Sequence, residues 1–162
     1  MPRLLAALVV LVFAALCPAA AQVAGGDGAA SADRVEARRL LDEADALRSA
    51  DRAGFERALE QLYARRDSLE LEDLQRLQYL RAYWLVLFGN DVTAGIARAQ
   101  TLFHEAADPD LRFRAGSLVA NSFAINRDFA EGLRFLERTL PMRHDVKDRN
   151  IRHDGTNVAA AL

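Results

Sequence analysis

The chain has 162 residues, which is the length of one ordinary domain. Hydrophobic residues make up 51% and charged residues 27%, with a formal net charge of −2, so the chain lacks the strongly basic character of nucleic-acid-binding proteins. A single cysteine, Cys17, excludes an intrachain disulfide. Alanine, leucine, arginine and glutamate dominate while β-branched residues are sparse, and this mixture favours an all-α fold.

Residues 1–21 have the layout of a signal peptide for export. Arg3 supplies the positive charge, Leu4–Leu16 forms the apolar core, and Ala19–Ala21 offers small residues for cleavage before Gln22. The apolar core is too short to span a bilayer. We therefore expect an exported, periplasmic protein, and processing would also remove the single cysteine.

Residues 22–32 are small and include glycines, so we expect a flexible linker there and a helical-repeat domain over residues 33–162. The domain has regularly spaced helix-start signals, and Pro109 and Pro141 mark a helix start and a helix end or kink. Asp33 and Asp128 are each followed three residues later by glutamate, as in a capping box. The expected N-caps are Asp33, Asp51, Ser68, Asp91, Asp108, Asp128 and Asp145.

The stretch Leu74–Phe88 is expected to be the central helix. It holds the only tryptophan, Trp84, and its second half, Ala82–Phe88, is apolar on all sides. We expect Trp84 to be buried in the core and its replacement by alanine to be among the most damaging substitutions. Gly89 and Asn90 follow, and both residue types accept the left-handed conformation that commonly ends a helix.

An internal repeat links several of these helices. Residues 89–96 align with residues 126–133, 37 residues later, and residues 51–55 are a shorter third copy. Each copy has a glycine one turn into a helix, which predicts close approach of a neighbouring helix. The glycines are Gly54, Gly95 and Gly132. The apolar residues Val92, Ile96, Ala99 and Phe103 have the same spacing as Phe129, Leu133, Leu136 and Leu140. In the third copy, Ala58 and Leu62 match Ala99 and Phe103.

This pattern resembles a degenerate tetratricopeptide repeat (TPR), although the TPR period is shorter and the usual Trp-Leu-Gly-Tyr set is missing from the first helix. Val92 and Phe129 stand where that repeat has an aromatic residue opening its second helix. The layout of residues 33–162 is also similar to the exported, TPR-like sensor region at the N-terminus of membrane-anchored GGDEF diguanylate cyclases. The segments that carry this resemblance are 47–55, 80–84, 89–91, 107–110 and 124–129.

The resemblance implies an all-α, TPR-like solenoid of antiparallel helix pairs, with about six to seven helices after the signal peptide. In that family the repeats continue into a transmembrane helix and a cyclase that makes cyclic di-GMP from GTP, so the domain here is expected to be truncated at its C-terminus. The chain itself is then a non-catalytic sensory input segment without cofactor, which binds a peptide, protein or small-molecule ligand. Membrane attachment would come only through the missing segment, and the open C-terminal end would favour self-association.

The sequence leaves two other functions open. One is a stand-alone periplasmic TPR-like scaffold that binds peptides or protein partners. The other is a small periplasmic hydrolase, which is disfavoured because no serine or threonine has a base at a motif spacing. The repeated triplets Arg143-His144-Asp145 and Arg152-His153-Asp154 lack the helical ligand spacing of a metal site, so we interpret them as charged turns.

In TPR-like arrays the first helix of each pair lines the concave face, so the resemblance places the binding surface on residues 74–88 and 111–125. The side chains expected there are Trp84, Arg114, Ser117 and Asn121. Arg114 and Asn121 would meet an anionic or peptide ligand in a groove beside Trp84. The alternative is that Arg114 is solvated and Asn121 bonds to a neighbouring helix.

Overall fold

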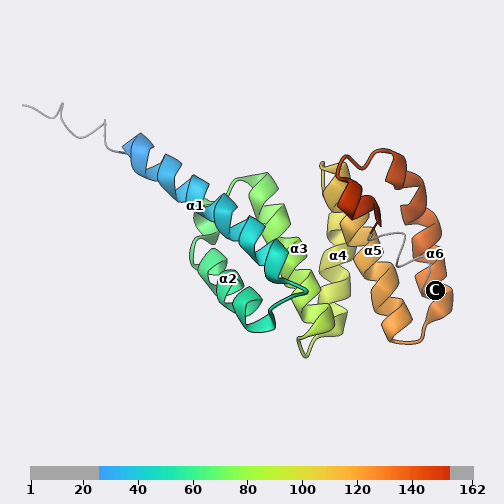
Figure 1. The fold of residues 1–162 in the computed structure, drawn as a ribbon. Helices are drawn as coiled ribbons and strands as arrows, with labels where there is room; N and C mark the ends of the chain where they lie inside the picture. The colour runs from blue at the N-terminus through green and yellow to red at the C-terminus, as the bar shows by residue number, and fades with distance from the viewer. Residues whose placement is uncertain (1–25, 154–162) are drawn as a thin grey trace, which may run out of the picture.

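The computed structural model describes residues 26–153, and the side chains from residue 31 onward. This part of the chain is all-helical, which confirms the expected fold class in its coarse form. The expected signal peptide and the apolar residues 158–162 lie outside the described residues. The helices are α1 (Gly26–Leu47), α2 (Arg52–Ala64), the 3-10 helix η1 (Arg66–Ser68), α3 (Leu71–Leu87), α4 (Val92–Glu105), α5 (Pro109–Ile125), α6 (Phe129–Thr139) and the 3-10 helix η2 (Leu140–His144), followed by a helical turn over residues 149–153 (Figure 1).

Neighbouring helices pack against each other along the chain. The closest packing joins α1 with α2, α3 with α4, α4 with α5, and α5 with α6 (Figure 1). The short connections between them leave room only for antiparallel neighbours. The central position expected for residues 74–88 is confirmed, because α3 contacts α1, α2, α4 and α5.

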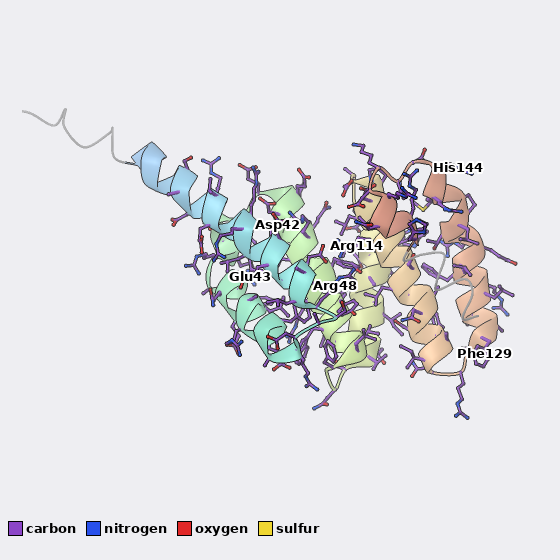
Figure 2. All side chains as sticks on the ribbon, in the orientation of Figure 1. Asp42, Glu43, Arg48, Arg114, Phe129 and His144 are labelled. Carbon is purple, nitrogen blue, oxygen red and sulfur yellow. The ribbon has the colours of Figure 1, made fainter. Side chains whose placement is uncertain are left out.

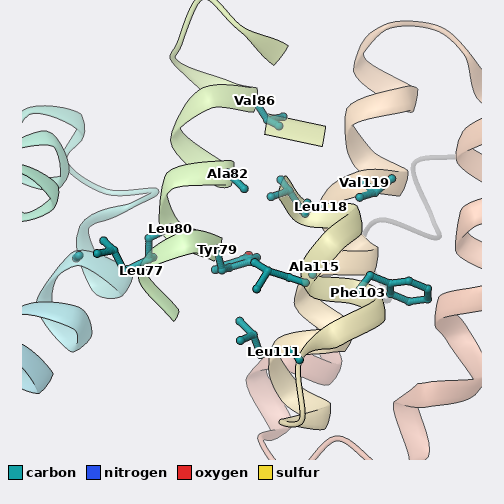
Figure 3. Packing of buried hydrophobic residues seen from close by; sticks show 14 of the residues in the cluster. Leu77, Tyr79, Leu80, Ala82, Val86, Phe103, Leu111, Ala115, Leu118 and Val119 are labelled. Atoms are coloured by element: carbon teal, nitrogen blue, oxygen red, sulfur yellow. The ribbon is translucent and has the colours of Figure 1, made fainter. Parts of the chain in front are cut away.

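The hydrophobic core runs through the whole array. From α3 it takes Leu77, Tyr79, Leu80 and Val86. Tyr79 and Val86 point toward buried side chains of α4 and α5, whereas Leu77 points to the opposite side of α3 (Figure 3). The largest fully buried side chains are Phe55, Phe113, Leu40, Leu41, Leu62, Leu77 and Val119. Trp84 is different from the expectation, since it is only half-buried and packs against the edge of this core.

Three of the expected aspartate caps form as predicted. The carboxylate of Asp91 accepts a hydrogen bond from Ala94 N at 2.9 Å, and that of Asp108 accepts from two N–H groups of the first turn of α5. Asp128 accepts from Glu131 N at 3.3 Å. Asp51 occupies the N-cap position of α2, but its side chain makes no capping bond. Pro141 follows the end of α6 as expected, within the 3-10 helix η2.

Three expected helix starts are wrong. Asp145 is one of them, because it ends η2 and the next helical turn begins only at residue 149. The first helix begins at Gly26, so Asp33 lies inside α1, and residues 26–32 of the expected linker are helical. Alanine supports helix there more strongly than the local cap signal opposes it. Ser68 lies in η1, where its hydroxyl donates to Arg65 O at 2.7 Å, and the N-cap of α3 is Glu70.

The left-handed helix ending also differs from the expectation. No described glycine has a positive φ, and Gly89 instead donates its N–H to Trp84 O at 2.9 Å. Arg127, directly after α5, has φ 62°. Around it, Arg127 N donates to Ala124 O and Asp128 N donates to Phe123 O, which is the hydrogen-bond pattern of a Schellman ending.

The expected close approach of a neighbouring helix is clearest at Gly95 and weaker at Gly54. An ideal Cβ at Gly95 would lie 2.8 Å from Val86 Cγ2 and 3.1 Å from Ala82 O, so α4 approaches the backbone of α3 closely. At Gly54 an ideal Cβ would meet the carboxylate of Asp51, at the start of the same helix, and also Leu47 Cδ1 of α1 at 3.1 Å.

Part of the expected apolar face is exposed. The sequence pattern predicts apolar helix faces that include Val35, Ile125, Phe129, Leu133 and Leu140, but these side chains are exposed to solvent. Periodicity identified an apolar face in each case, and no described neighbour covers these positions.

Candidate functional site

A polar cluster lies where the end of α1 approaches α3 and α5. We call it the Asp45–Arg114 cluster, and it consists of Asp45, Arg48, Tyr79, Tyr83 and Arg114. Tyr83 belongs to it because the guanidinium of Arg48 lies 5.0 Å from the centre of its ring. Arg114 donates to both carboxylate oxygens of Asp45, one bond at 2.8 Å, and its guanidinium lies 4.3 Å from the centre of the Tyr79 ring. Arg48 pairs with Asp45 at 2.9 Å and donates to the Tyr79 hydroxyl at 3.3 Å. Figure 2 marks Arg48 and Arg114 in this region.

The central ion pair is largely removed from water. The side chains of Arg114 and Asp45 are 13% and 28% exposed. Burial by itself would raise the pKa of Asp45, but the hydrogen bonds and charge of Arg114, with the charge of Arg48, outweigh burial and lower the pKa of that carboxyl. Asp45 is therefore a carboxylate at neutral pH, and Arg114 is held in a fixed bidentate geometry.

Two polar atoms beside this ion pair lack a protein partner. Arg114 Nε and Ser117 Oγ are buried without a hydrogen bond to another group. A cavity of about 10 Å³ next to Arg114 is lined by Asp45, Arg76, Tyr79, Leu80, Leu111 and Arg114. That volume is near the smallest that holds one water molecule, and it is far below the size of a small-molecule site.

The expected site residues fall into two groups. Arg114, Ser117 and Asn121 lie on one face of α5, because residues three and four apart are neighbours on a helix surface. Trp84 lies five residues after Tyr79 on α3, which is a rotation of about 140° around the helix. Its Nε1 donates to Glu56 Oε1 of α2 at 3.1 Å, and the guanidinium of Arg81 lies 4.5 Å from its ring. Trp84 therefore faces α2 and does not join the Asp45–Arg114 cluster.

The alternative expectation of a solvated Arg114 is wrong, because its side chain is only 13% exposed. The carboxylate that accepts its hydrogen bonds belongs to Asp45, which lies 69 residues earlier in the chain. Sequence reasoning missed Asp45 and Arg48 as site residues. The available signal was the position of Asp45 next to the buried residue Ala44, because a carboxylate at the edge of a buried face needs a partner.

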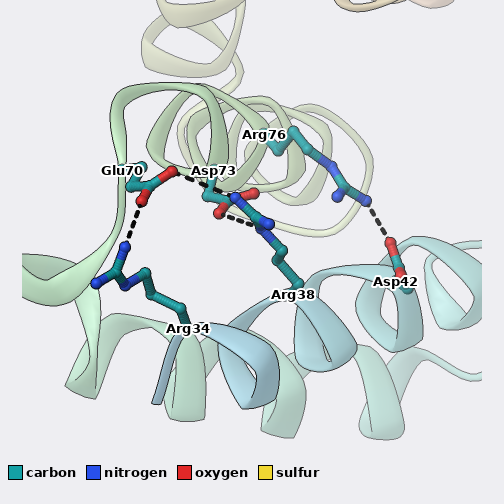
Figure 4. Close-up of polar contacts among 6 residues, drawn as sticks. All are labelled: Arg34, Arg38, Asp42, Glu70, Asp73 and Arg76. Atoms are coloured by element: carbon teal, nitrogen blue, oxygen red, sulfur yellow. Dashed lines mark hydrogen bonds and ion pairs between the residues drawn. The ribbon is translucent and has the colours of Figure 1, made fainter. Parts of the chain in front are cut away.

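A second set of ion pairs joins α1 to the first turns of α3 (Figure 4). Arg38 bridges Glu70 and the buried carboxylate of Asp73, at 3.3 and 3.1 Å. Arg34 pairs with Glu70, and Arg76 pairs with Asp42 at 2.7 Å. Each of these charged groups has an oppositely charged partner within the network. We therefore interpret the network as ion pairs that attach α1 to α3, and not as a ligand site.

Within residues 31–153, no group of three or more histidine, cysteine, aspartate or glutamate side chains is placed to hold a metal ion. His144 and His153, from the two repeated triplets, are both exposed. None of the helices in the described range is both long enough and apolar enough to cross a membrane.

Comparisons with protein-family models, with curated proteins and with solved structures find no match to this chain. The candidate site therefore rests on its geometry, whose central feature is the Arg114 guanidinium at the junction of α1, α3 and α5.

Proposed function

We propose that this chain is the exported sensory input segment of a GGDEF diguanylate cyclase-type signalling protein, built as a TPR-like array of helix pairs that binds a peptide or protein partner. The pairing of α1 with α2, α3 with α4 and α5 with α6, together with contacts of α3 to both α1 and α5, supports an array of this kind. The binding surface lies on the first helices of the pairs. The sequence resemblance supplies the signalling context.

The observation that carries the binding proposal is the ordered Arg114 on Tyr79. A guanidinium held in bidentate geometry matches a carboxylate, and the C-terminus of a peptide presents this group. The neighbouring cavity is too small to enclose a ligand, which favours a partner laid across the surface over an enclosed small molecule.

In this proposal Asp45 occupies the place of the partner's carboxylate while the site is empty. Binding then replaces one Arg114–carboxylate pair by another, so Asp45 competes with the ligand. Asn121 is half-buried two turns further along α5 and lies on the face that the partner would follow, whereas Ser117, one turn along, is buried and lies beneath that surface.

Opposite effects of two variants test the proposal. We would measure fluorescence anisotropy of labelled peptides with a free C-terminus, and of the same peptides amidated. Asp45→Asn should tighten binding of the free-acid peptides by releasing Arg114, and Arg114→Met should weaken it. Both variants should lower the melting temperature, so stability alone cannot produce opposite binding effects.

Arg134→Ala is the matched control, because Arg134 is an exposed arginine on α6 that pairs with Glu131. Its effect on peptide binding should be small. Equal weakening by Asp45→Asn and Arg114→Met, or equal binding of amidated peptides, would contradict a carboxylate site at Arg114.

Two further observations test the cellular context. Mass spectrometry of the protein from a periplasmic extract should find Gln22 as the first residue, and a full-length cytosolic product would contradict export. Sequencing the gene beyond codon 162 distinguishes a sensory segment, followed by a transmembrane helix and a GGDEF domain, from a stand-alone scaffold.

A further inference from the structure

The face of α3 opposite Tyr79 carries a second arginine that is held by aromatic rings. Arg81 follows Tyr79 by two residues, which is a rotation of about 200° around the helix. Its guanidinium lies 4.5 Å from the centre of the Trp84 ring and 5.8 Å from the centre of the Tyr63 ring on α2. Arg81 is half-buried, and the two rings restrict the positions that its side chain can occupy.

Trp84 is contacted from three sides. Its Nε1 donates to Glu56 Oε1 at 3.1 Å, and Arg81 lies over its ring. An ideal Cβ at Gly89 would lie 2.8 Å from Trp84 Cζ3, so the backbone at Gly89 packs directly against the edge of the indole. The indole is therefore an ordered platform, and Arg81 has little conformational freedom left to lose when an acceptor binds to it.

Arg81 has no acceptor for its own donors. It makes no hydrogen bond or ion pair with any residue in the range 31–153, whereas Arg76 and Arg114, which are also half-buried, each pair with an aspartate. In this range the buried side-chain nitrogen and oxygen atoms without a partner belong to Arg114 and Ser117, so the nitrogens of Arg81 reach solvent. Stacking uses the faces of a guanidinium and leaves the donors at its edge available to an anion.

A second arginine without a carboxylate partner lies near the first. Arg98 of α4 donates to Gln78 Oε1 at 2.8 Å, and Gln78 lies one turn before Arg81 on the same side of α3. Arg98 is exposed and forms no ion pair in the described part of the chain. Because Arg98 occupies the amide oxygen of Gln78, the amide nitrogen is left as a further donor. Two positive charges and an amide donor therefore meet where α3 and α4 pack together.

The α2 helix contributes two acidic residues to the surface around Tyr63. Glu56 is engaged by Arg52 at 3.0 Å and by the indole of Trp84. Glu60 lies between Glu56 and Tyr63 on one face of α2, is exposed, and forms no ion pair with another described residue. Neither carboxylate is bonded to Arg81 or Arg98, and the charge of Glu60 opposes the binding of an anion nearby.

We propose that Arg81, Arg98 and the amide of Gln78 bind a phosphate group. A phosphate carries about two negative charges near neutral pH, which balances two guanidinium groups, whereas one carboxylate balances only one. Its tetrahedral oxygens accept hydrogen bonds from donors that approach from two different helices. The ligand is inorganic phosphate or a small phosphate monoester. This site lies on the other side of α3 from Arg114 and does not depend on the peptide-binding proposal.

Trp84 is the only tryptophan in the chain, so its fluorescence reports directly on this site. We would titrate the full chain with inorganic phosphate and with glycerol phosphate, and compare acetate and chloride at the same ionic strength. Each phosphate compound should give a saturable change, because the bound anion alters the charge beside the indole. Tighter binding of glycerol phosphate would identify a monoester as the ligand, and equal or weaker binding would identify the free ion. A response that does not saturate, or one that acetate reproduces, would overturn the proposal.

Substitutions of opposite sign identify the residues involved. Arg81→Met and Arg98→Met should each weaken phosphate binding by about tenfold, which corresponds to the loss of one charge-assisted hydrogen bond. Glu60→Gln should tighten binding, because it removes a negative charge from the surroundings. Arg98 and Glu60 are exposed, so their variants should fold like the wild type and leave the contact of Arg81 with the indole intact.

Arg143→Met is the matched control, because Arg143 is an exposed arginine on η2 without an ion pair to another described residue. Its affinity for phosphate should equal that of the wild type. Unchanged affinity in Arg98→Met, weaker binding by Glu60→Gln, or an equal loss in Arg143→Met would each overturn the assignment of this site.

Discussion

The Asp45–Arg114 ion pair gives the most direct quantitative prediction. We would remove each partner separately and together, with Asp45→Asn, Arg114→Met and the double variant, and compare the free energies of unfolding. The double-mutant cycle isolates the coupling between the two side chains from their separate effects.

The expected coupling follows from the burial of the pair. Two unit charges about 4 Å apart attract by about 4 kcal/mol at an effective dielectric constant of about 20. Exposed pairs measure only about 0.2–1 kcal/mol, and breaking a fully buried pair costs about 3–5 kcal/mol. With side chains 13% and 28% exposed and a bidentate contact, we expect a coupling of about 2–3 kcal/mol.

The pH dependence has a definite sign. The pKa of Asp45 is lowered in the folded protein, so the unfolded chain takes up a proton at a higher pH than the folded chain does. The stabilisation is complete at neutral pH and is lost as the pH falls below about 4, the ordinary aspartate pKa. The stability difference between wild type and Asp45→Asn should therefore shrink on acidification.

Urea unfolding followed by circular dichroism supplies these free energies. The exposed Arg39–Glu43 pair on α1 is the control, and its cycle should give a much smaller coupling. A coupling near zero for Asp45 and Arg114, or one no larger than that of the control pair, would refute the claim that this ion pair is largely removed from water.

Three further predictions use the same unfolding measurement. Asp91→Ala should lower the free energy of unfolding by about 1 kcal/mol, because it removes a capping hydrogen bond at the start of α4. Asp51→Ala should lower it clearly less, because the Asp51 side chain makes no capping bond, and equal losses would contradict this distinction. Arg127→Gly should stabilise the protein by roughly 1 kcal/mol, since its positive φ suits glycine, and destabilisation would mean that the arginine side chain contributes more than the backbone gains. Phe55→Ala should cost about 3–5 kcal/mol and the half-buried Trp84→Ala less; the reverse order would place Trp84 in the core.

The features that sequence predicted well are local ones. Asp91, Asp108 and Asp128 form their caps because each carboxylate bonds to N–H groups two or three residues away. The same local physics explains the failure at Asp33, where alanine-rich sequence upstream continues the helix past a good cap. The residue at which a helix starts depends both on the local N-cap residue and on the helix propensity of the residues before it, so an N-cap residue alone does not determine the start.

The candidate site depends on contacts that periodicity does not report. Arg114 was placed on the correct helix, but its partner comes from α1, 69 residues away. Trp84 was expected in the core because its helix is apolar on all sides, and yet its ring lies at an edge where Glu56 accepts its N–H. A sequence pattern identifies which face of a helix is apolar, while the neighbouring helices decide which part of that face is covered.

The order of the helix contacts has a consequence for how the chain folds. The main packing contacts join helices that are neighbours or next neighbours along the chain, from α1 with α2 to α5 with α6. Each such contact closes a short loop, so the entropic barrier to folding is low and folding should be fast. Such a chain also opens in parts, with the terminal helices separating before α3 and α4, which are held from both sides. A partner that grips α1, α3 and α5 together would couple those separate openings into one cooperative transition.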